Sequence, residues 1–258
     1  MARRPRGPEQ ADDPTISEFD GIRYLHFGTE WVQGAMRVRR PAELVLTYTA
    51  QMMAWLLFLE PHEEDRVAVL GLGAGSLTRF CCKHLSAHVV TVEWDPRVSA
   101  IAARHFRLPG PDRAPIDHAD AGQWVTDPAH AHTMRAVMVD LYDAQARGPV
   151  RDSVAFYSGC RRVLSEAGVV AVNLFGNHDS FPRNIDNLHA AFDDRVVLLP
   201  EIDEGNRIAL AFSGPPLVLS PDMLLARAEI VQIKYGLPAT RWARSLIGLA
   251  ARDGMLYF

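Results

Sequence analysis

The sequence has few cysteines and no excess of positive charge. Its three cysteines, the adjacent Cys81 and Cys82 and the distant Cys160, form neither a disulfide framework nor a pair spaced for a metal ion. We therefore expect a reducing, cytoplasmic environment and no metal site. The 27 basic and 31 acidic side chains give a formal net charge of −4. Because nucleic-acid binding relies on clustered Lys and Arg, we expect no nucleic-acid partner.

Long apolar runs are missing as well. Residues 44–59 are the most apolar stretch, but three polar residues interrupt it, and it is shorter than the roughly 20 apolar residues of a membrane span. The first residues, MARRPRGPEQADDPT, have no apolar core of the kind that a signal peptide needs. We predict that residues 1–18 are a disordered leader, and we expect no membrane partner.

A chain of 258 residues with 48% hydrophobic positions is long enough for one α/β domain and a small additional element. Residues 19–60 are predicted to form that element. It would consist of a β-hairpin over Gly21–Met36 and a hydrophobic helix that follows Pro41 and ends before Pro61. Residues 61–258 are predicted to form a Rossmann-like domain, because short apolar runs alternate there with longer helical stretches.

The predicted sheet has seven strands. They are expected at residues 67–70, 88–93, 115–118, 136–140, 169–174, 196–199 and 207–212. Helices are expected at residues 76–85, 96–105, 121–127, 153–164 and 185–191. Because the last two strands are close in the sequence, we expect them to be antiparallel. This rhythm matches a methyltransferase-type sheet better than a dehydrogenase.

The strongest local signal is a glycine-rich turn after the first strand. The segment VAVLGLGAGSLTRF leads from a buried strand through Gly71, Gly73 and Gly75 into a helix. Glycines let the main chain approach a ligand closely, and a helix N-terminus favours negative or hydroxyl-rich groups. Glu93 ends the second strand about 20 residues later, the spacing at which an acid reaches ribose hydroxyls. We predict a nucleoside site, with a turn that binds no ligand as the structural alternative.

Further acids follow the third and fourth strands. Asp120 either contacts an adenine amino group or caps the helix that begins at Ala121, and the two roles are compatible. Asp140 ends the fourth strand, and Asp143 follows on the same loop. Open α/β sheets bind ligands outside the carboxyl ends of their strands. The pair would therefore suit a cationic substrate, one acid taking a proton and the other holding charge, unless both acids simply face water.

These segments together resemble the spermidine synthase (polyamine aminopropyltransferase) family, in particular its shorter bacterial spermidine synthase-like members. The resemblance extends from Gly21 to Phe212. It rests on VQGAM, GLGAGSLTRF, ADAGQWV, VMVDLYDAQARGP and FYSGCRRVLSEAGVVAVNLFG, with Tyr48 and Glu93 between them. It implies transfer of an aminopropyl group from decarboxylated S-adenosylmethionine to putrescine or a similar amine, with release of methylthioadenosine and without a prosthetic group.

The resemblance also implies roles for individual residues. The positions that match the family's co-substrate contacts are Gln33, Gly71, Gly73, Gly75, Glu93, Asp120 and Ala121. Asp140 matches its catalytic acid, Asp143 the acid that steadies the polyamine, and Tyr48 its substrate-side tyrosine. We also expect a homodimer that uses the exposed hairpin and the hydrophobic helix.

One departure from the family keeps other functions open. The family's glycine turn reads GGGDGG, and its Asp, which binds the amino group of the co-substrate, is replaced here by Ala74. Because Ala74 would leave room near the amino-acid end of the co-substrate, a methyltransferase using intact S-adenosylmethionine is a second hypothesis. A non-catalytic nucleoside-binding protein is the third.

Overall fold

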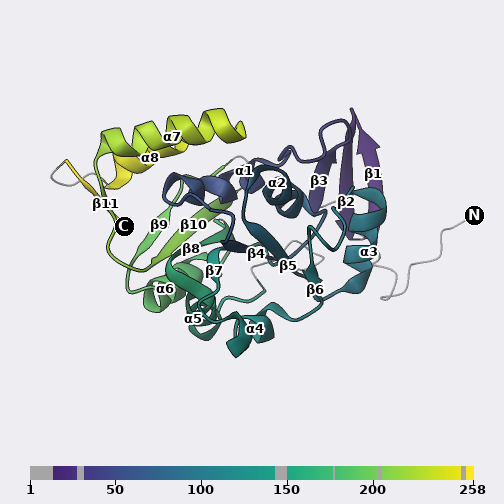
Figure 1. Cartoon of the computed structure of the whole chain (residues 1–258), viewed down its shortest axis with the longest axis horizontal. Coiled ribbons are helices and arrows are strands. Elements are labelled where there is room, and N and C mark those ends of the chain that lie inside the picture. The colour runs from purple at the N-terminus through teal and green to yellow at the C-terminus, as the bar shows by residue number, and fades with distance from the viewer. Residues whose placement is uncertain (1–13, 28–31, 143–149, 177, 203–204, 251–253) are drawn as a thin grey trace, which may run out of the picture.

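A computed structural model describes most of the chain. The described residues are 14–27, 32–142, 150–176, 178–202, 205–250 and 254–258. They contain a three-stranded sheet near the N-terminus, a central seven-stranded sheet, and a two-stranded sheet near the C-terminus. Helices cover both faces of the central sheet (Figure 1).

The N-terminal element is a three-stranded antiparallel sheet of β1 (Pro14–Phe19), β2 (Ile22–Phe27) and β3 (Gly34–Arg37). Asp20 and Gly21 join β1 to β2 with φ angles of 48° and 69°, as tight hairpin turns require. The prediction of a disordered leader through residue 18 is therefore wrong for residues 14–18, which belong to β1. Strand β1 was not predicted because almost all of its residues are exposed, so no alternation of buried and exposed positions marks it.

The hydrophobic helix after Pro41 begins later than predicted. Helix α1 covers Thr47–Met52 and continues as the 3₁₀ helix η2 (Met53–Leu57). Residues 52–57 are 0–2% exposed, because they pack against one face of the central sheet. The hydrophobic helix is therefore part of the core, and residues 52–57 offer no exposed surface to the expected dimer.

All seven predicted strands are present in the central sheet. They are β4 (Arg66–Leu70), β5 (His88–Val92), β6 (Ile116–Asp117), β7 (Met134–Val139), β8 (Leu164–Phe175), β9 (Val196–Leu198) and β10 (Asn206–Ser213). Their order is β6-β5-β4-β7-β8-β10-β9, with β10 antiparallel to both of its neighbours and the other pairs parallel. The predicted α/β class and the antiparallel final pair are confirmed.

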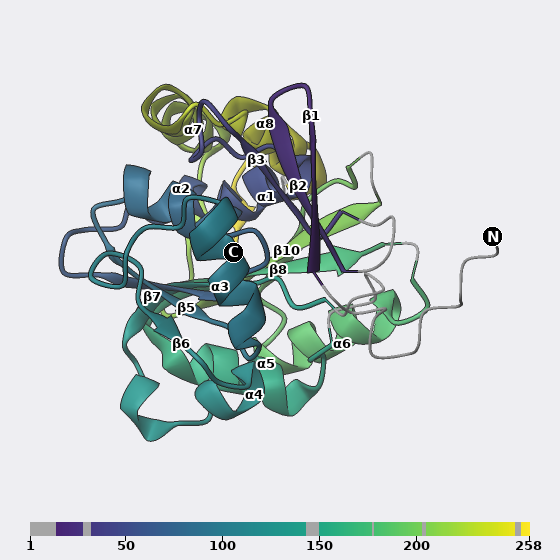
Figure 2. The ribbon, with the colours of Figure 1, turned by 90° about the vertical axis from the view of Figure 1, so that its right-hand side faces the viewer.

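The two faces of the sheet bury alternate residues of each strand. Val67 and Val69 of β4 face one core, whereas Ala68 and Leu70 face the other, as a period of two residues dictates. The first core is covered by α1, η2 and α2 (Ser76–His84). The second is covered by α4 (Ala121–Trp124), α5 (Val154–Val163) and α6 (Phe181–Ala191). Helix α3 (Pro96–His105) and the N-terminal sheet lie beyond β5 and β6, as the turned view in Figure 2 shows.

Two long helices near the C-terminus were not predicted. Helix α7 (Pro221–Tyr235) and helix α8 (Ala239–Ala250) pack against η2 and complete the first core. The sequence does contain their signals, because Ser220 caps α7 through its hydroxyl, Pro221 occupies the first turn, and Gly236 ends the helix at φ 69°. A two-stranded sheet of β11 (Val218–Leu219) and β12 (Leu256–Tyr257) flanks them. Among the described residues, no helix is both long and apolar enough to cross a membrane.

Candidate active site

The glycine turn brings the exits of two parallel strands into contact. Gly71, Gly73 and Gly75 have φ angles of 96°, 49° and 73°, which glycine adopts without strain. A Cβ on Gly71 would lie 2.2 Å from the main-chain oxygen of Asp140. The Asp140 amide also donates to Leu70 O at 2.9 Å. The turn and Asp140, about 70 residues apart in the sequence, therefore form one corner.

Glu93 supports the glycine turn from the other side. Its Oε2 accepts a hydrogen bond from the Leu72 amide at 3.1 Å, and its Oε1 accepts one from the Asp95 amide at 2.9 Å. Burial raises the pKa of the Glu93 carboxyl, and these main-chain donors act in the opposite direction. Glu93 and Asp140 follow strands that flank β4 in parallel, so both lie at the carboxyl edge of the sheet. The acids predicted to share a site thus lie at the same edge.

A buried arginine fixes the turn to the N-terminal element. Arg79 is 3% exposed. Its guanidinium donates to three main-chain oxygens: Pro41 at 2.7 Å, Phe106 at 2.9 Å, and Ala74 in the glycine turn. Burial lowers the pKa of Arg79 to about 10, so the group is still charged near neutral pH. The sequence analysis did not single out Arg79, because main-chain acceptors leave no mark in a sequence.

Asp140 lies in a network of side chains from four elements. The Tyr48 hydroxyl of α1 donates to Oδ2 at 3.3 Å, and the Asn173 amide of β8 donates to Oδ1 at 3.0 Å. The Asn206 amide of β10 donates in turn to Asn173 Oδ1 at 2.9 Å. That bond fixes the orientation of Asn173, whose NH₂ group must then face Asp140. The structure therefore joins Tyr48 and Asp140 as predicted and adds Asn206, which the sequence analysis missed.

Opposing effects act on the carboxyl of Asp140. Burial raises its pKa, whereas the hydrogen bonds from Asn173 and Tyr48 lower it. A carboxylate whose pKa is raised is a stronger base in its ionised form, which suits it to accept a proton.

Several predicted residues line one small cavity at this corner. Gln33, Tyr48, Gly71, Gly73 and Asp140 border a space of about 20 Å³. That volume holds one water-sized group, so a bound nucleoside must lie largely outside it. Glu93 lies at the same carboxyl edge of the sheet but does not line this cavity.

Asp120 and Ala121 lie further along the same edge. Asp120 caps α4 by accepting from the Gln123 amide at 3.2 Å, as one of the two predicted roles requires. Its carboxylate also forms an ion pair with Arg151. Burial alone would raise the pKa of Asp120, but the contacts with Arg151 and the main chain outweigh it and lower the pKa. Ala121 is 7% exposed, and the predicted amine-binding Asp143 lies outside the described residues.

Ala74, the basis of the methyltransferase hypothesis, borders the small cavity and packs against the N-terminal sheet. Its methyl group is 2% exposed and packs with Leu25, Met36 and Phe106. It also lies so close to Gly34 that a Cβ there would be 2.5 Å away. The N-terminal sheet therefore covers the methyl group of Ala74.

Trp94 is a third residue that was not predicted from the sequence. It follows Glu93 directly and is 75% exposed, whereas Trp55, Trp124 and Trp242 are at most 5% exposed. Exposed tryptophans often mark contact sites. An aromatic residue directly after the acid of the second strand was the available signal. Trp124 is instead buried and stacks on His130 with ring centroids 4.1 Å apart.

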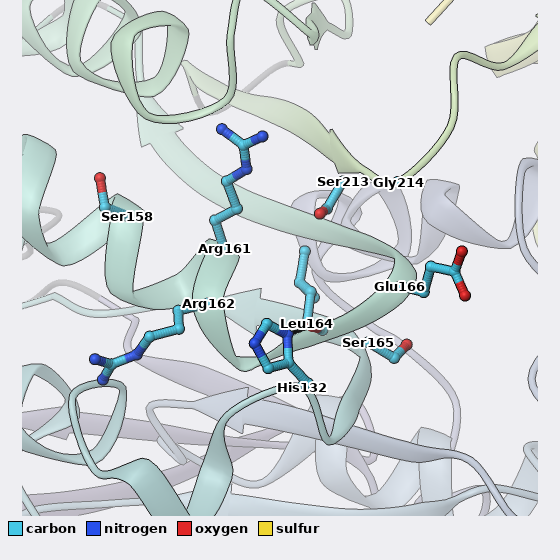
Figure 3. Close-up of a pocket in the computed structure, with 9 residues that line it drawn as sticks. All are labelled: His132, Ser158, Arg161, Arg162, Leu164, Ser165, Glu166, Ser213 and Gly214. Carbon is cyan, nitrogen blue, oxygen red and sulfur yellow. Dashed lines mark hydrogen bonds between the residues drawn. The ribbon is translucent and has the colours of Figure 1, made fainter.

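A larger cavity of about 400 Å³ lies at the opposite edge of the sheet, near the amino ends of β7 and β8. The guanidinium groups of Arg161 and Arg162 point in different directions there (Figure 3). Arg161 binds Ala191 O and Asp193, and Arg162 binds Val125 O. Because both guanidinium groups bind main-chain oxygens, they do not point together at a ligand position in the cavity. Among the described residues, no cluster of His, Cys, Asp and Glu could hold a metal ion.

Comparisons with known proteins point to one group of enzymes. No family model matches the chain. It is 33% identical over 240 residues to a polyamine aminopropyltransferase of Neisseria meningitidis serogroup A, covering 92% of this chain and 89% of that protein. It is 32% identical over 231 residues to a polyamine aminopropyltransferase of Chromobacterium violaceum, covering 89% and 87% of the two chains.

Solved structures share the fold at lower sequence identity. A probable spermidine synthase from Corynebacterium glutamicum aligns with a TM-score of 0.71 at 15% identity, over 95% of this chain and 86% of that one. Human methyltransferase-like protein 13 in complex with SAH aligns with a TM-score of 0.61 at 20% identity, over 75% of this chain and 94% of that one. A spermidine synthase in complex with the transition-state analogue AdoDATO aligns with a TM-score of 0.56 at 19% identity, over 78% of this chain and 73% of that one. The predicted methyltransferase-type fold is therefore confirmed.

Proposed function

Because the chain belongs to the polyamine aminopropyltransferase family, we propose that it transfers an aminopropyl group from decarboxylated S-adenosylmethionine to putrescine or a similar diamine. The observation that carries the proposal is the junction of Asp140 with the glycine turn, where an ionisable acid lies beside a nucleoside-type turn. Relatives of the same name and a spermidine synthase bound to AdoDATO support this type of reaction.

Glu93 is suited to hold the ribose of the co-substrate. Each of its oxygens accepts one main-chain hydrogen bond, and a carboxylate has about four acceptor sites in total. The Trp94 amide also acts on the carboxyl, so at least one acceptor site remains for a ribose hydroxyl. Gln33, Gly71, Gly73 and Gly75 would contact the rest of the thionucleoside.

The adenine would lie beyond the ribose, between the exits of β5 and β6. Ala121 and the carboxylate of Asp120 flank this position, and Asp120 would have to bind the adenine amino group while paired with Arg151. The indole of Trp94 offers a flat, exposed surface on which a base can stack. We propose these contacts as the specificity for adenine.

The amine would bind on the other side of the glycine turn, at Asp140. A primary ammonium with a pKa of about 10.4 must lose a proton before it attacks carbon, which costs about 4 to 5 kcal/mol near pH 7. Asp140 would accept that proton, and Tyr48 and Asn173 would hold its carboxylate in place. Asp143 would bind the charge at the far end of the diamine.

The reaction then needs no acid for the leaving group. The amine nitrogen forms a bond to the methylene carbon next to the sulfonium while the carbon–sulfur bond breaks. The electron pair of that bond remains on sulfur, which leaves as neutral methylthioadenosine. Positioning of nitrogen, carbon and sulfur in line can supply several kcal/mol of the barrier reduction.

The test is an assay of methylthioadenosine release from decarboxylated S-adenosylmethionine and putrescine, with Asp140→Asn as the comparison. Turnover by the wild type well above that of the variant is expected. A wild type that binds S-adenosylhomocysteine more tightly than methylthioadenosine, and that methylates an acceptor, would make it a methyltransferase. Binding of methylthioadenosine without turnover of any amine would make it a non-catalytic homologue.

We also propose that the protein is cytoplasmic and forms a homodimer. The cytoplasmic assignment is supported by Cys81, Cys82 and Cys160, which are free thiols. The dimer is supported by exposed apolar residues outside the active site, as described next.

A further inference from the structure

Helix α7 has two apolar sides, although a surface helix usually needs only one. The buried side, which packs on η2 and α8, consists of Leu224, Ala228, Val231 and Tyr235. The exposed apolar residues on the opposite side are Met223, Ala226, Ile230 and Ile233. Ile233 is 86% exposed, more than any other large hydrophobic residue described. In Figure 1, α7 forms the outer edge of the molecule at the end away from the N-terminal sheet.

The spacing of the exposed residues is that of a coiled-coil seam. Met223, Ala226, Ile230 and Ile233 are separated by three, four and three residues. This is the a-d-a-d pattern with which two helices pack against each other. Because the second apolar side follows this rule, a helix is the partner that it fits.

Charged residues flank the stripe in a matching order. Asp222 and Glu229 precede the two a positions, on one flank. Arg227 and Lys234 follow the two d positions, on the other flank. At 100° per residue these pairs lie on opposite sides of the stripe, one acidic and one basic.

We propose that the exposed stripe of α7 is the contact between two copies of this chain, in which the two α7 helices lie side by side in parallel. In a parallel pair, the acidic flank of one helix faces the basic flank of the other. Glu229 then meets Lys234 of the second copy, whereas Arg227 stays bound to the main chain at Leu56 and Leu59 of its own copy. In an antiparallel pair, acid would face acid and base would face base. The charges therefore specify both the partner and the orientation.

Two features determine the strength of this contact. Arg227 and Lys234 each form an ion pair with Glu60 at 3.0 Å. Arg227 also donates to the main-chain oxygens of Leu56 and Leu59, so Lys234 is the cation of the basic flank that is freer to face the partner. The stripe covers only two heptads of a 15-residue helix, less than the extent of a typical stable interface. We therefore expect a reversible dimer whose fraction increases with protein concentration.

The first test is sedimentation velocity of the full chain over a range of concentrations. The wild type should shift from monomer to dimer, and Ile233→Glu should raise the dissociation constant about tenfold or more. Phe19→Glu is the matched control, because Phe19 is 77% exposed on β1, far from α7. Both side chains face solvent, so the melting temperature and methylthioadenosine release should not change. A monomeric wild type, or a dimer that Phe19→Glu weakens and Ile233→Glu does not, would overturn the proposal.

Exchange of charges tests the orientation. Glu229→Lys and Lys234→Glu should each weaken self-association about fivefold, because each places like charges across the contact. An equal mixture of the two variants should regain wild-type association. In a dimer of one copy of each variant, position 229 of either copy again faces an opposite charge at position 234 of the other copy. If Glu229→Lys instead strengthens self-association, the helices are antiparallel and the proposed arrangement is wrong.

Discussion

On the glycine-turn side of the site, charged side chains bind main-chain atoms, whereas on the Asp140 side, polar side chains bind one another. Glu93 accepts from the amides of Leu72 and Asp95, and Arg79 donates to three carbonyls. Asp140 instead receives its hydrogen bonds from Tyr48 and Asn173. The hydrogen bonds on the glycine-turn side therefore stabilise the main-chain conformation, whereas those on the Asp140 side position side chains.

This difference predicts how the two sides respond to substitution. Loss of Glu93 or Arg79 leaves buried main-chain groups without partners, which costs folding free energy. On the Asp140 side, Asn at position 140 would still offer an oxygen to the Asn173 amide, and Phe at position 48 would remove only one of the donors to the carboxylate. Changes on the Asp140 side should therefore reduce activity while stability is retained, and changes on the turn side should reduce both.

The largest expected effect is that of Asp140→Asn. An amide cannot accept the proton of the ammonium, so kcat should fall about 1,000-fold, which corresponds to about 4 kcal/mol of transition-state stabilisation. Methylthioadenosine release measures the loss, and thermal unfolding should remain close to that of the wild type. A kcat within tenfold of the wild type would exclude Asp140 as the proton acceptor.

Arg79→Met should produce the largest loss of stability. The carbonyls of Pro41, Ala74 and Phe106 would lose their donor, at a cost of about 3 kcal/mol in the free energy of unfolding. The urea midpoint measures it. Arg104→Met, on the exposed side of α3, is the matched control and should change the free energy by less than about 0.5 kcal/mol. Equal midpoints for the two variants would contradict the role assigned to Arg79.

Glu93→Gln should reduce ligand affinity and stability together. Glutamine has one acceptor oxygen where glutamate has two, so either the Leu72 or the Asp95 amide loses its partner. We expect the dissociation constant for methylthioadenosine to rise about 30-fold, which corresponds to about 2 kcal/mol, with a measurable fall in the urea midpoint. Calorimetry and urea unfolding test the two parts. If Glu93→Gln binds methylthioadenosine more weakly but unfolds at the wild-type urea midpoint, Glu93 behaves like the residues near Asp140. The proposed difference between the two sides would then be wrong.

The turn side was also the more predictable from the sequence. Glycine spacing and an acid about 20 residues later are local signals, and the parallel sheet then brings Glu93 and Asp140 to one edge. Asn206 was not predictable in this way, because its contact with Asn173 depends on the antiparallel register of β10 on β8. Arg79 was missed because its partners are main-chain oxygens, which every residue has. Helix α7 had recognisable caps, but its two apolar sides obscure the usual 3.6-residue period.

Tyr48→Phe should have the smallest effect, and it tests how the Asp140 network sets the pH range. The Tyr48 hydroxyl donates to the ionised carboxylate and so lowers the pKa of Asp140 against the effect of burial. Without that bond, worth about 1 kcal/mol, the pKa of Asp140 rises. Since Asp140 must be ionised to accept a proton, the acidic limb of the kcat/KM profile should move to higher pH. Tyr142→Phe is the control, because its hydroxyl donates to the Asn173 main-chain oxygen at 3.1 Å, and its acidic limb should not move. A limb that stays in place in Tyr48→Phe, or moves to lower pH, would show that the hydroxyl does not stabilise the charged acid.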